Sequence, residues 1–135
     1  IGIQGHIPEG DGRMMGLLLL EIILDARQPL HELIADLQQL AGPTSYARTD
    51  LRLRTPIAKQ DMVTRLTDGA PASIAGQGIH AIDTLDGVKY RLADESWLLI
   101  RPSGTEPVLR VYAEAPTEPA VQALLDYGRG IAQAT

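Results

Sequence analysis

The sequence predicts an α+β fold with a mainly antiparallel sheet and helices packed on it. Residues 47–54 alternate apolar and polar side chains, which is typical of a half-buried strand. Short apolar segments separated by turn residues follow between positions 79 and 115, whereas residues 30–40 and 121–131 carry apolar side chains at helical spacing. Because the predicted strands and helices are segregated rather than strictly alternating, we expect an antiparallel sheet.

Composition excludes several classes of protein. The chain has 135 residues, a net charge of −5 and no cysteine, so disulfide scaffolds, thiolate metal sites and thiol nucleophiles are excluded. An acidic chain is poorly suited to bind nucleic acid, which requires clustered positive charge. The longest apolar run, Met14 to Leu24, is interrupted by Gly16 and Glu21 and is shorter than the roughly 20 residues that span a bilayer. We therefore expect neither a nucleic acid nor a membrane as partner.

The N-terminal part is predicted to be a short helical segment. Asp11 is a suitable N-cap for a helix over residues 14–26, and Pro29 suits the first turn of a second helix that Gly42-Pro43 ends. The second helix carries one apolar stripe, formed by Leu30, Leu33, Ile34, Leu37 and Leu40. We assign residues 1–41 to this segment and residues 42–48 to a linker.

Residues 49–135 are predicted to form a second domain. After the strand over 47–53, Thr55-Pro56 offers the start of a helix, and residues 68–78 read as a loop. Strands over 79–85 and 88–92 are joined by Asp86-Gly87, a strong hairpin signal. Two further strands, over 97–101 and 108–115, precede a C-terminal helix.

The loop between the last two strands has the chemistry of an anion site. Arg101 offers a guanidinium fork, Ser103 and Thr105 offer hydroxyl groups, and Gly104 allows close approach of the backbone. Arg110 lies in the following strand, so both arginines converge on one small dianion if the two strands are adjacent. A surface turn with two solvated arginines is the alternative that the residues leave open.

The segment Trp97 to Pro107, followed by Arg110, resembles the phosphate-binding loop of the α-D-phosphohexomutase family. The segment Gly5 to Gly12, with the apolar helix that reaches Leu20-Glu21, is similar to the end of that family's third domain. The resemblance implies that residues 1–41 are the tail of domain three and residues 49–135 are domain four, whose fold in the family resembles that of the TATA-binding protein. It also implies that the chain is the C-terminal fragment of a longer enzyme.

The resemblance further implies a function and a site. Arg101, Ser103, Gly104, Thr105 and Arg110 match the positions that hold the phosphate that is not transferred. The parent would be a cytoplasmic isomerase of carbohydrate metabolism that interconverts hexose 1-phosphate and 6-phosphate through a phosphorylated serine, Mg²⁺ and a hexose bisphosphate intermediate. Those parts would lie upstream, so we expect no catalytic residue, metal ligand or cofactor in this fragment, and no activity from it alone. The expected partners are a sugar phosphate and the upstream domains; the alternative is a stand-alone phosphate- or anion-binding module.

The remaining polar residues point to no further site. Asp86 and Asp83 are expected to be turn and hairpin residues, and the alternating arginines of residues 48–54 are expected to form a solvated face. The three histidines have no metal-like spacing; they are His6, His31 and His80.

Overall fold

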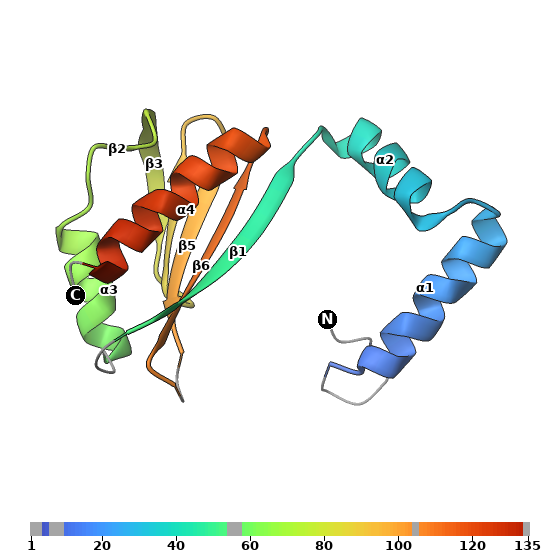
Figure 1. The fold of residues 1–135 in the computed structure, drawn as a ribbon, viewed down its shortest axis with the longest axis horizontal. Helices are drawn as coiled ribbons and strands as arrows, with labels where there is room; N and C mark the ends of the chain where they lie inside the picture. The colour runs from blue at the N-terminus through green and yellow to red at the C-terminus, as the bar shows by residue number, and fades with distance from the viewer. Residues whose placement is uncertain (1–3, 6–9, 54–57, 104–105, 134–135) are drawn as a thin grey trace. The chain divides into compact units, whose positions relative to one another are not determined.

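The computed structural model describes residues 4–5, 10–53, 58–103 and 106–133, and the chain divides into two compact units, Ile1–Gly42 and Pro43–Thr135. The first unit contains the helices α1 (Gly12–Ala26) and α2 (Leu30–Ala41) (Figure 1). The predicted N-cap is confirmed, because the backbone N–H groups of Arg13 and Met14 donate to Asp11 Oδ1 at 3.0 and 3.1 Å. Pro29 is the N-cap of α2 rather than a residue of its first turn.

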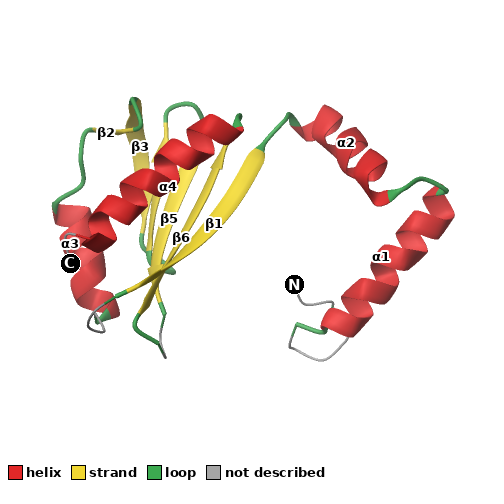
Figure 2. Cartoon of the chain, viewed as in Figure 1, coloured by secondary structure: helices red, strands yellow, loops and turns green. Residues whose placement is uncertain are grey.

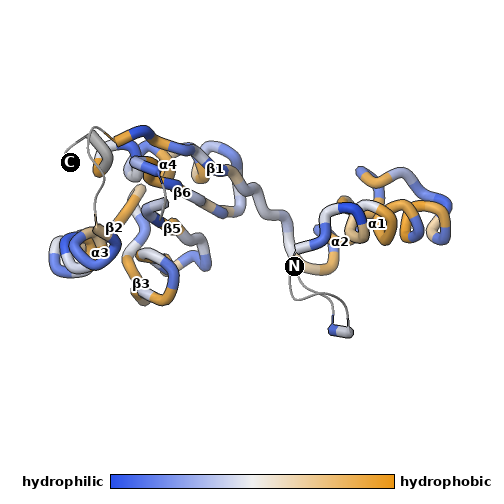
Figure 3. The backbone as a smooth tube through the Cα atoms, turned by 90° about the horizontal axis from the view of Figure 1, so that it is seen from below, coloured by the Kyte–Doolittle hydropathy of each residue, from blue (hydrophilic) through white to orange (hydrophobic). Residues whose placement is uncertain are grey.

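Neither helix of the first unit has a buried residue. Leu24 is 72% exposed and Leu40 is 88% exposed, although both belong to helices with apolar stripes. Figure 3 shows the hydrophobic colour along much of α1. The apolar side chains that the helical spacing predicts as a buried stripe are thus largely uncovered within this unit.

The second unit is a six-stranded sheet with two helices (Figure 2). The strand order is β1-β6-β5-β4-β3-β2, and every pairing is antiparallel, so the predicted α+β class with a mainly antiparallel sheet is confirmed. The elements are β1 (Ser45–Arg52), α3 (Lys59–Asp68), β2 (Ser73–Ile74), β3 (Gln77–Asp83), β4 (Val88–Leu92), β5 (Trp97–Pro102), β6 (Val108–Ala115) and α4 (Glu118–Gln133). No described helix is long and apolar enough to cross a bilayer.

Two segments predicted as loop or linker contain strands. Residues 45–48 of the expected linker belong to β1, because this stretch pairs with the end of β6, starting with Ser45 opposite Ala115. Within residues 68–78, Ala75 and Gly76 both have positive φ, of 49° and 83°, and make the tight turn that joins β2 to β3. The glycine content therefore marks a small hairpin rather than an irregular loop. The helix start predicted at Thr55-Pro56 lies outside the described residues.

Both α3 and α4 pack on one face of the sheet. Tyr90 of β4 is fully buried there and donates its hydroxyl hydrogen to the Leu66 carbonyl of α3 at 2.8 Å. On the same face, Gly128 of α4 lies against Val111 of β6, where an added Cβ would come within 2.5 Å of Val111 Cγ1. We call the opposite face of the sheet the open face. It carries the exposed residues of β1 and the partly exposed residues of β5 and β6.

Candidate functional site

Arg101 and Arg110 lie side by side on the open face. They are directly opposite one another in the antiparallel pairing of β5 with β6. Their strand neighbours Ile100 and Leu109 are fully buried, so the arginine side chains leave the sheet on the opposite face. Residues opposed in this way have Cβ atoms about 4.5–5.5 Å apart. Both guanidinium groups are therefore within reach of a single small anion.

This arrangement places two like charges next to each other. Like charges directly opposite on a sheet are unfavourable, so the pair needs compensating negative charge. Arg110 Nε is buried and has no hydrogen-bond partner among the described residues. A buried donor without a partner costs about 1–3 kcal/mol, and an anion at this place would remove that cost.

Asp50 of β1 flanks the arginine pair on one side, because it pairs with Arg110 across the β1–β6 ladder. Arg48 Nε donates to Asp50 Oδ1 at 2.7 Å, and this hydrogen bond, followed by the charges of Arg48 and Arg110, holds the pKa of the Asp50 carboxyl below its usual range. Asp50 therefore remains an anion at neutral pH.

Asp86 flanks the pair on the other side. It lies in the connection between β3 and β4, and its Oδ2 is 3.2 Å from Arg101 Nε. Its other oxygen, Oδ1, is 3.6 Å from Nζ of Lys59, the first residue of α3. The sequence predicts Asp86 only as a turn residue; its contact with Arg101 arises because the β3–β4 connection lies close to the end of β5.

The loop from β5 to β6 is closed at its base by the backbone. The Ser103 N–H donates to the Val108 carbonyl at 2.8 Å, and the Leu53 N–H donates to the Pro107 carbonyl at 2.8 Å, which attaches the loop to the chain beyond β1. Because the Ser103 N–H is already bonded within the protein, any contact of this residue with a ligand would have to come from its hydroxyl group. Of the other predicted site residues, Gly104 and Thr105 lie outside the described part of the chain.

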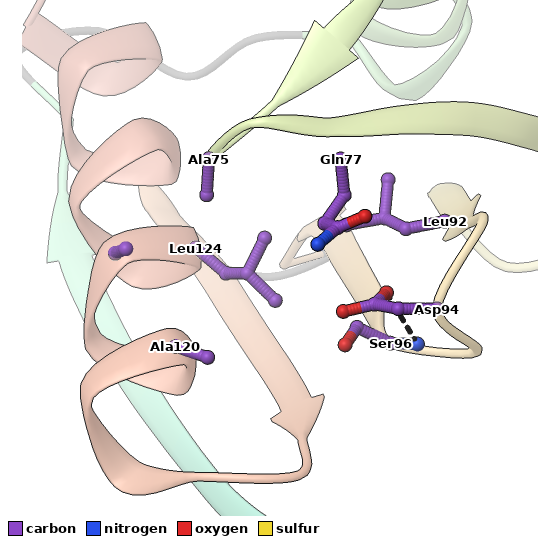
Figure 4. Close-up of a pocket in the computed structure, with 8 residues that line it drawn as sticks. Ala75, Gln77, Leu92, Asp94, Ser96, Ala120 and Leu124 are labelled. Carbon is purple, nitrogen blue, oxygen red and sulfur yellow. Dashed lines mark hydrogen bonds between the residues drawn. The ribbon is translucent and has the colours of Figure 1, made fainter.

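The rest of the described chain has a small cavity but no metal site. The described residues include no group of three or more His, Asp or Glu side chains placed to hold a metal ion. A cavity of about 80 Å³ lies between α4 and the β4–β5 turn, where Asp94 accepts a hydrogen bond from the Ser96 backbone (Figure 4). Its lining residues include none of the predicted site residues. His6 lies outside the described residues.

The fold and the arginine pair define an α+β domain with a cationic site at one end of the neighbouring strands β5 and β6. Residues 51–127 match the family described as phosphoglucomutase/phosphomannomutase, C-terminal domain. The chain belongs to that family, and the expected family relationship is thus confirmed.

Curated relatives are mutases. The chain is 38% identical over 104 residues to a phosphopentomutase of Thermococcus kodakarensis, and the aligned segment covers 77% of this chain and 21% of the relative. It is 33% identical over 120 residues to a probable phosphoglucosamine mutase of Methanothermobacter thermautotrophicus, covering 89% of this chain and 25% of the relative. It is 34% identical over 118 residues to a phosphoglucosamine mutase of Methanococcus aeolicus, covering 87% and 24%. The chain thus spans about a fifth to a quarter of the length of these relatives.

Proposed function

We propose that this domain binds the phosphate group of a phosphosugar that is not being transferred, within a phosphosugar mutase. Arg101 and Arg110 grip the phosphate oxygens, with hydroxyl or backbone donors from Ser103, Gly104 and Thr105. The observation that carries the proposal is the direct opposition of the two arginines on the open face, one of them with a buried and unpartnered Nε. Family membership and the mutase names of the relatives support the same reading.

Phosphate recognition without sugar recognition suits a mutase. Phosphoryl transfer depends chiefly on positioning and on neutralising charge. A substrate that must be held with either end toward the reacting group is best gripped by contacts common to both orientations. Guanidinium groups recognise the tetrahedral oxyanion through paired N–H donors, and nothing in this contact depends on the identity of the sugar.

Several parts of the proposed reaction lie outside this site. The described residues do not fit Mg²⁺, since none of them form an acidic or histidine cluster for a metal ion, and no step of the proposal passes through it. The magnesium ion, the phosphorylated serine and the cytoplasmic location stay predictions for the whole enzyme. So does the assignment of residues 1–41 to the end of a preceding domain, and so does the inactivity of the fragment alone.

Titration with glucose 6-phosphate, followed by NMR, tests the proposal. We expect the arginine Nε–Hε signals of Arg101 and Arg110 and the amide signal of Ser103 to shift with millimolar ligand. Arg101→Ala or Arg110→Ala should weaken binding roughly 10- to 100-fold, since a hydrogen bond to a charged group contributes about 1.5–3 kcal/mol. Glucose, which lacks the phosphate, should produce no such shifts.

Arg91→Ala is the matched control. Arg91 is also an arginine of the sheet, but it pairs with Trp97 rather than with the arginine pair, and it contacts Asp83. If Arg91→Ala weakens ligand binding as much as Arg101→Ala does, the binding depends on general surface charge and not on the arginine pair. If the wild-type protein shows no shifts, the proposal is rejected. A stand-alone anion-binding module would show the same binding. Fusion of the chain to upstream mutase domains separates the two functions, because a stand-alone module would produce no mutase activity.

A further inference from the structure

Asp86 contacts Arg101 at one particular edge of its guanidinium group. The contact is with Nε, at 3.2 Å. A guanidinium has five N–H donors in a rigid plane, so a carboxylate at Nε fixes the orientation of that plane and leaves terminal N–H groups for another acceptor. The Arg101 side chain is 40% exposed, and without this contact its long stem would sample many rotamers.

The backbone holds Asp86 in this place. The next residue, Gly87, has a φ of +98° and packs against β5 so closely that an added Cβ would lie 2.4 Å from the Ile100 carbonyl oxygen and 3.0 Å from Arg101 Cα. Only glycine fits there without strain. The β3–β4 connection, which carries Asp86, therefore packs directly against the backbone of Arg101. This main-chain packing brings the Asp86 carboxylate within reach of the Arg101 guanidinium.

Lys59 balances the charge of Asp86. Its ammonium group lies 3.6 Å from the carboxylate oxygen that does not face Arg101. A lone carboxylate beside a phosphate site would repel a dianion, but with a lysine on its far side the local charge of the three groups remains positive. The carboxylate can thus orient the arginine without cancelling the attraction for phosphate.

We propose that Asp86 is a positioning residue for phosphate binding: it holds the Arg101 guanidinium by Nε so that its terminal N–H groups face the anion, and Lys59 offsets its charge. The inference rests on the proposed function, since it assigns a role within the same site. The alternative is that Asp86 competes with phosphate for the Arg101 guanidinium, so that phosphate has to displace the carboxylate before it can bind.

Two substitutions separate these roles, with inorganic phosphate as the probe and binding measured by NMR titration. Asp86→Ala removes the ion-pair partner of Arg101 and should weaken phosphate binding by roughly two- to fivefold, the equivalent of one exposed ion pair. Asp86→Asn keeps an oxygen near Arg101 Nε while it removes the negative charge, so it should bind phosphate more tightly than Asp86→Ala does. If Asp86 instead competes with phosphate for Arg101, both Asp86→Ala and Asp86→Asn should bind phosphate more tightly than the wild-type protein.

The Arg101 Nε–Hε signal of the ligand-free protein gives a second readout. We expect it to shift and broaden in Asp86→Ala and to stay near its wild-type position in Asp86→Asn. Asp83→Ala is the control, because Asp83 also pairs with an arginine, Arg91, but not with Arg101. If Asp86→Ala does not fold, Asp86→Ser replaces it, since its side chain is too short to reach Nε.

Unchanged or tighter phosphate binding by Asp86→Ala overturns the inference, and so does an unchanged Arg101 signal in that variant. If the wild-type protein binds phosphate and Arg101→Ala abolishes binding while Asp86→Ala has no effect, only this inference fails. If the wild-type protein does not bind phosphate at all, the proposed function fails together with it.

Discussion

Replacing Gly87 with alanine tests whether the β3–β4 connection is as tightly packed against the site as its geometry indicates. Two costs arise at this position. The φ of +98° is unfavourable for any residue with a Cβ, and the new methyl group would lie 2.4 Å from the Ile100 carbonyl oxygen. Since the atoms that it meets first are backbone atoms of β5, no side-chain rotation relieves the contact.

The two costs give the expected magnitude. Left-handed backbone costs a residue with a Cβ about 1–2 kcal/mol, and overpacking at a well-packed site costs about 1–3 kcal/mol. Gly87→Ala should therefore lower the free energy of unfolding by about 2–5 kcal/mol. For a folded unit of this size, each 1 kcal/mol corresponds to a fall in melting temperature of roughly 4–8 °C.

Gly76→Ala is the matched control. Gly76 also has a positive φ, of 83°, but an added Cβ there would meet no atom within 4 Å. Urea denaturation followed by circular dichroism should give a loss of only about 1–2 kcal/mol for this variant. Equal losses in the two variants would refute the close approach of Gly87 to β5. If Gly87→Ala folds, it should also weaken phosphate binding, because it moves Asp86 away from Arg101; Gly76→Ala should not.

Three further outcomes follow from the packing and the charges. Gly128→Ala should destabilise the protein in urea by up to about 2 kcal/mol, because the clash with Val111 exceeds the gain in helix propensity, whereas Gly130→Ala, which meets no atom within 4 Å, should stabilise it by about 0.5–1 kcal/mol. Burial raises the pKa of Tyr90 to about 12, so the stability that the neutral phenol provides is complete below about pH 10 and is lost by up to about 1.4 kcal/mol per pH unit between the unfolded and the folded pKa, with no further loss above the folded pKa. Tyr90→Phe, which loses the hydrogen bond to Leu66, should be less stable at pH 8 but should show a smaller alkaline decline, because only Tyr127, whose pKa burial also raises, then contributes to it. Arg48→Gln should raise the pKa of Asp50 toward its usual value, as a carboxyl ¹³C titration would measure, and an unchanged pKa would contradict the assigned cause.

The position of Arg110 was predictable from the sequence because strand alternation is strict. Leu109 and Val111 are fully buried, so Arg110 between them has to face the other side of β6. The short loop between the last two strands favours their pairing, which places Arg101 beside Arg110. The local sequence pattern therefore predicts on which face of the sheet each arginine lies and that the two arginines are neighbours.

The role of Asp86 was not predictable in the same way. Asp-Gly indicates a hairpin turn wherever it occurs, and nothing in the neighbouring residues says which other part of the sheet the turn will touch. The contact with Arg101 depends on the register of β4 against β5, which places Val88 opposite Ile100 and so brings Gly87 against the backbone of β5. Register is a property of the whole sheet, set by the core face of each strand.

The charges around the arginine pair suggest why a carboxylate on each side is compatible with binding a dianion. A row of neighbouring groups is linked by ion pairs and by strand register, and it consists of Arg48, Asp50, Arg110, Arg101, Asp86 and Lys59. Four cations and two carboxylates leave a net charge of +2 in this row, whereas a phosphate monoester carries about −1.5 to −2 at neutral pH. The carboxylates reduce repulsion among the cations, and the remaining charge would match that of the proposed phosphate ligand. Neutralising Lys59 or Arg48 should therefore weaken phosphate binding even though each lies at an outer end of the row, and the loss should shrink as salt screens the charges.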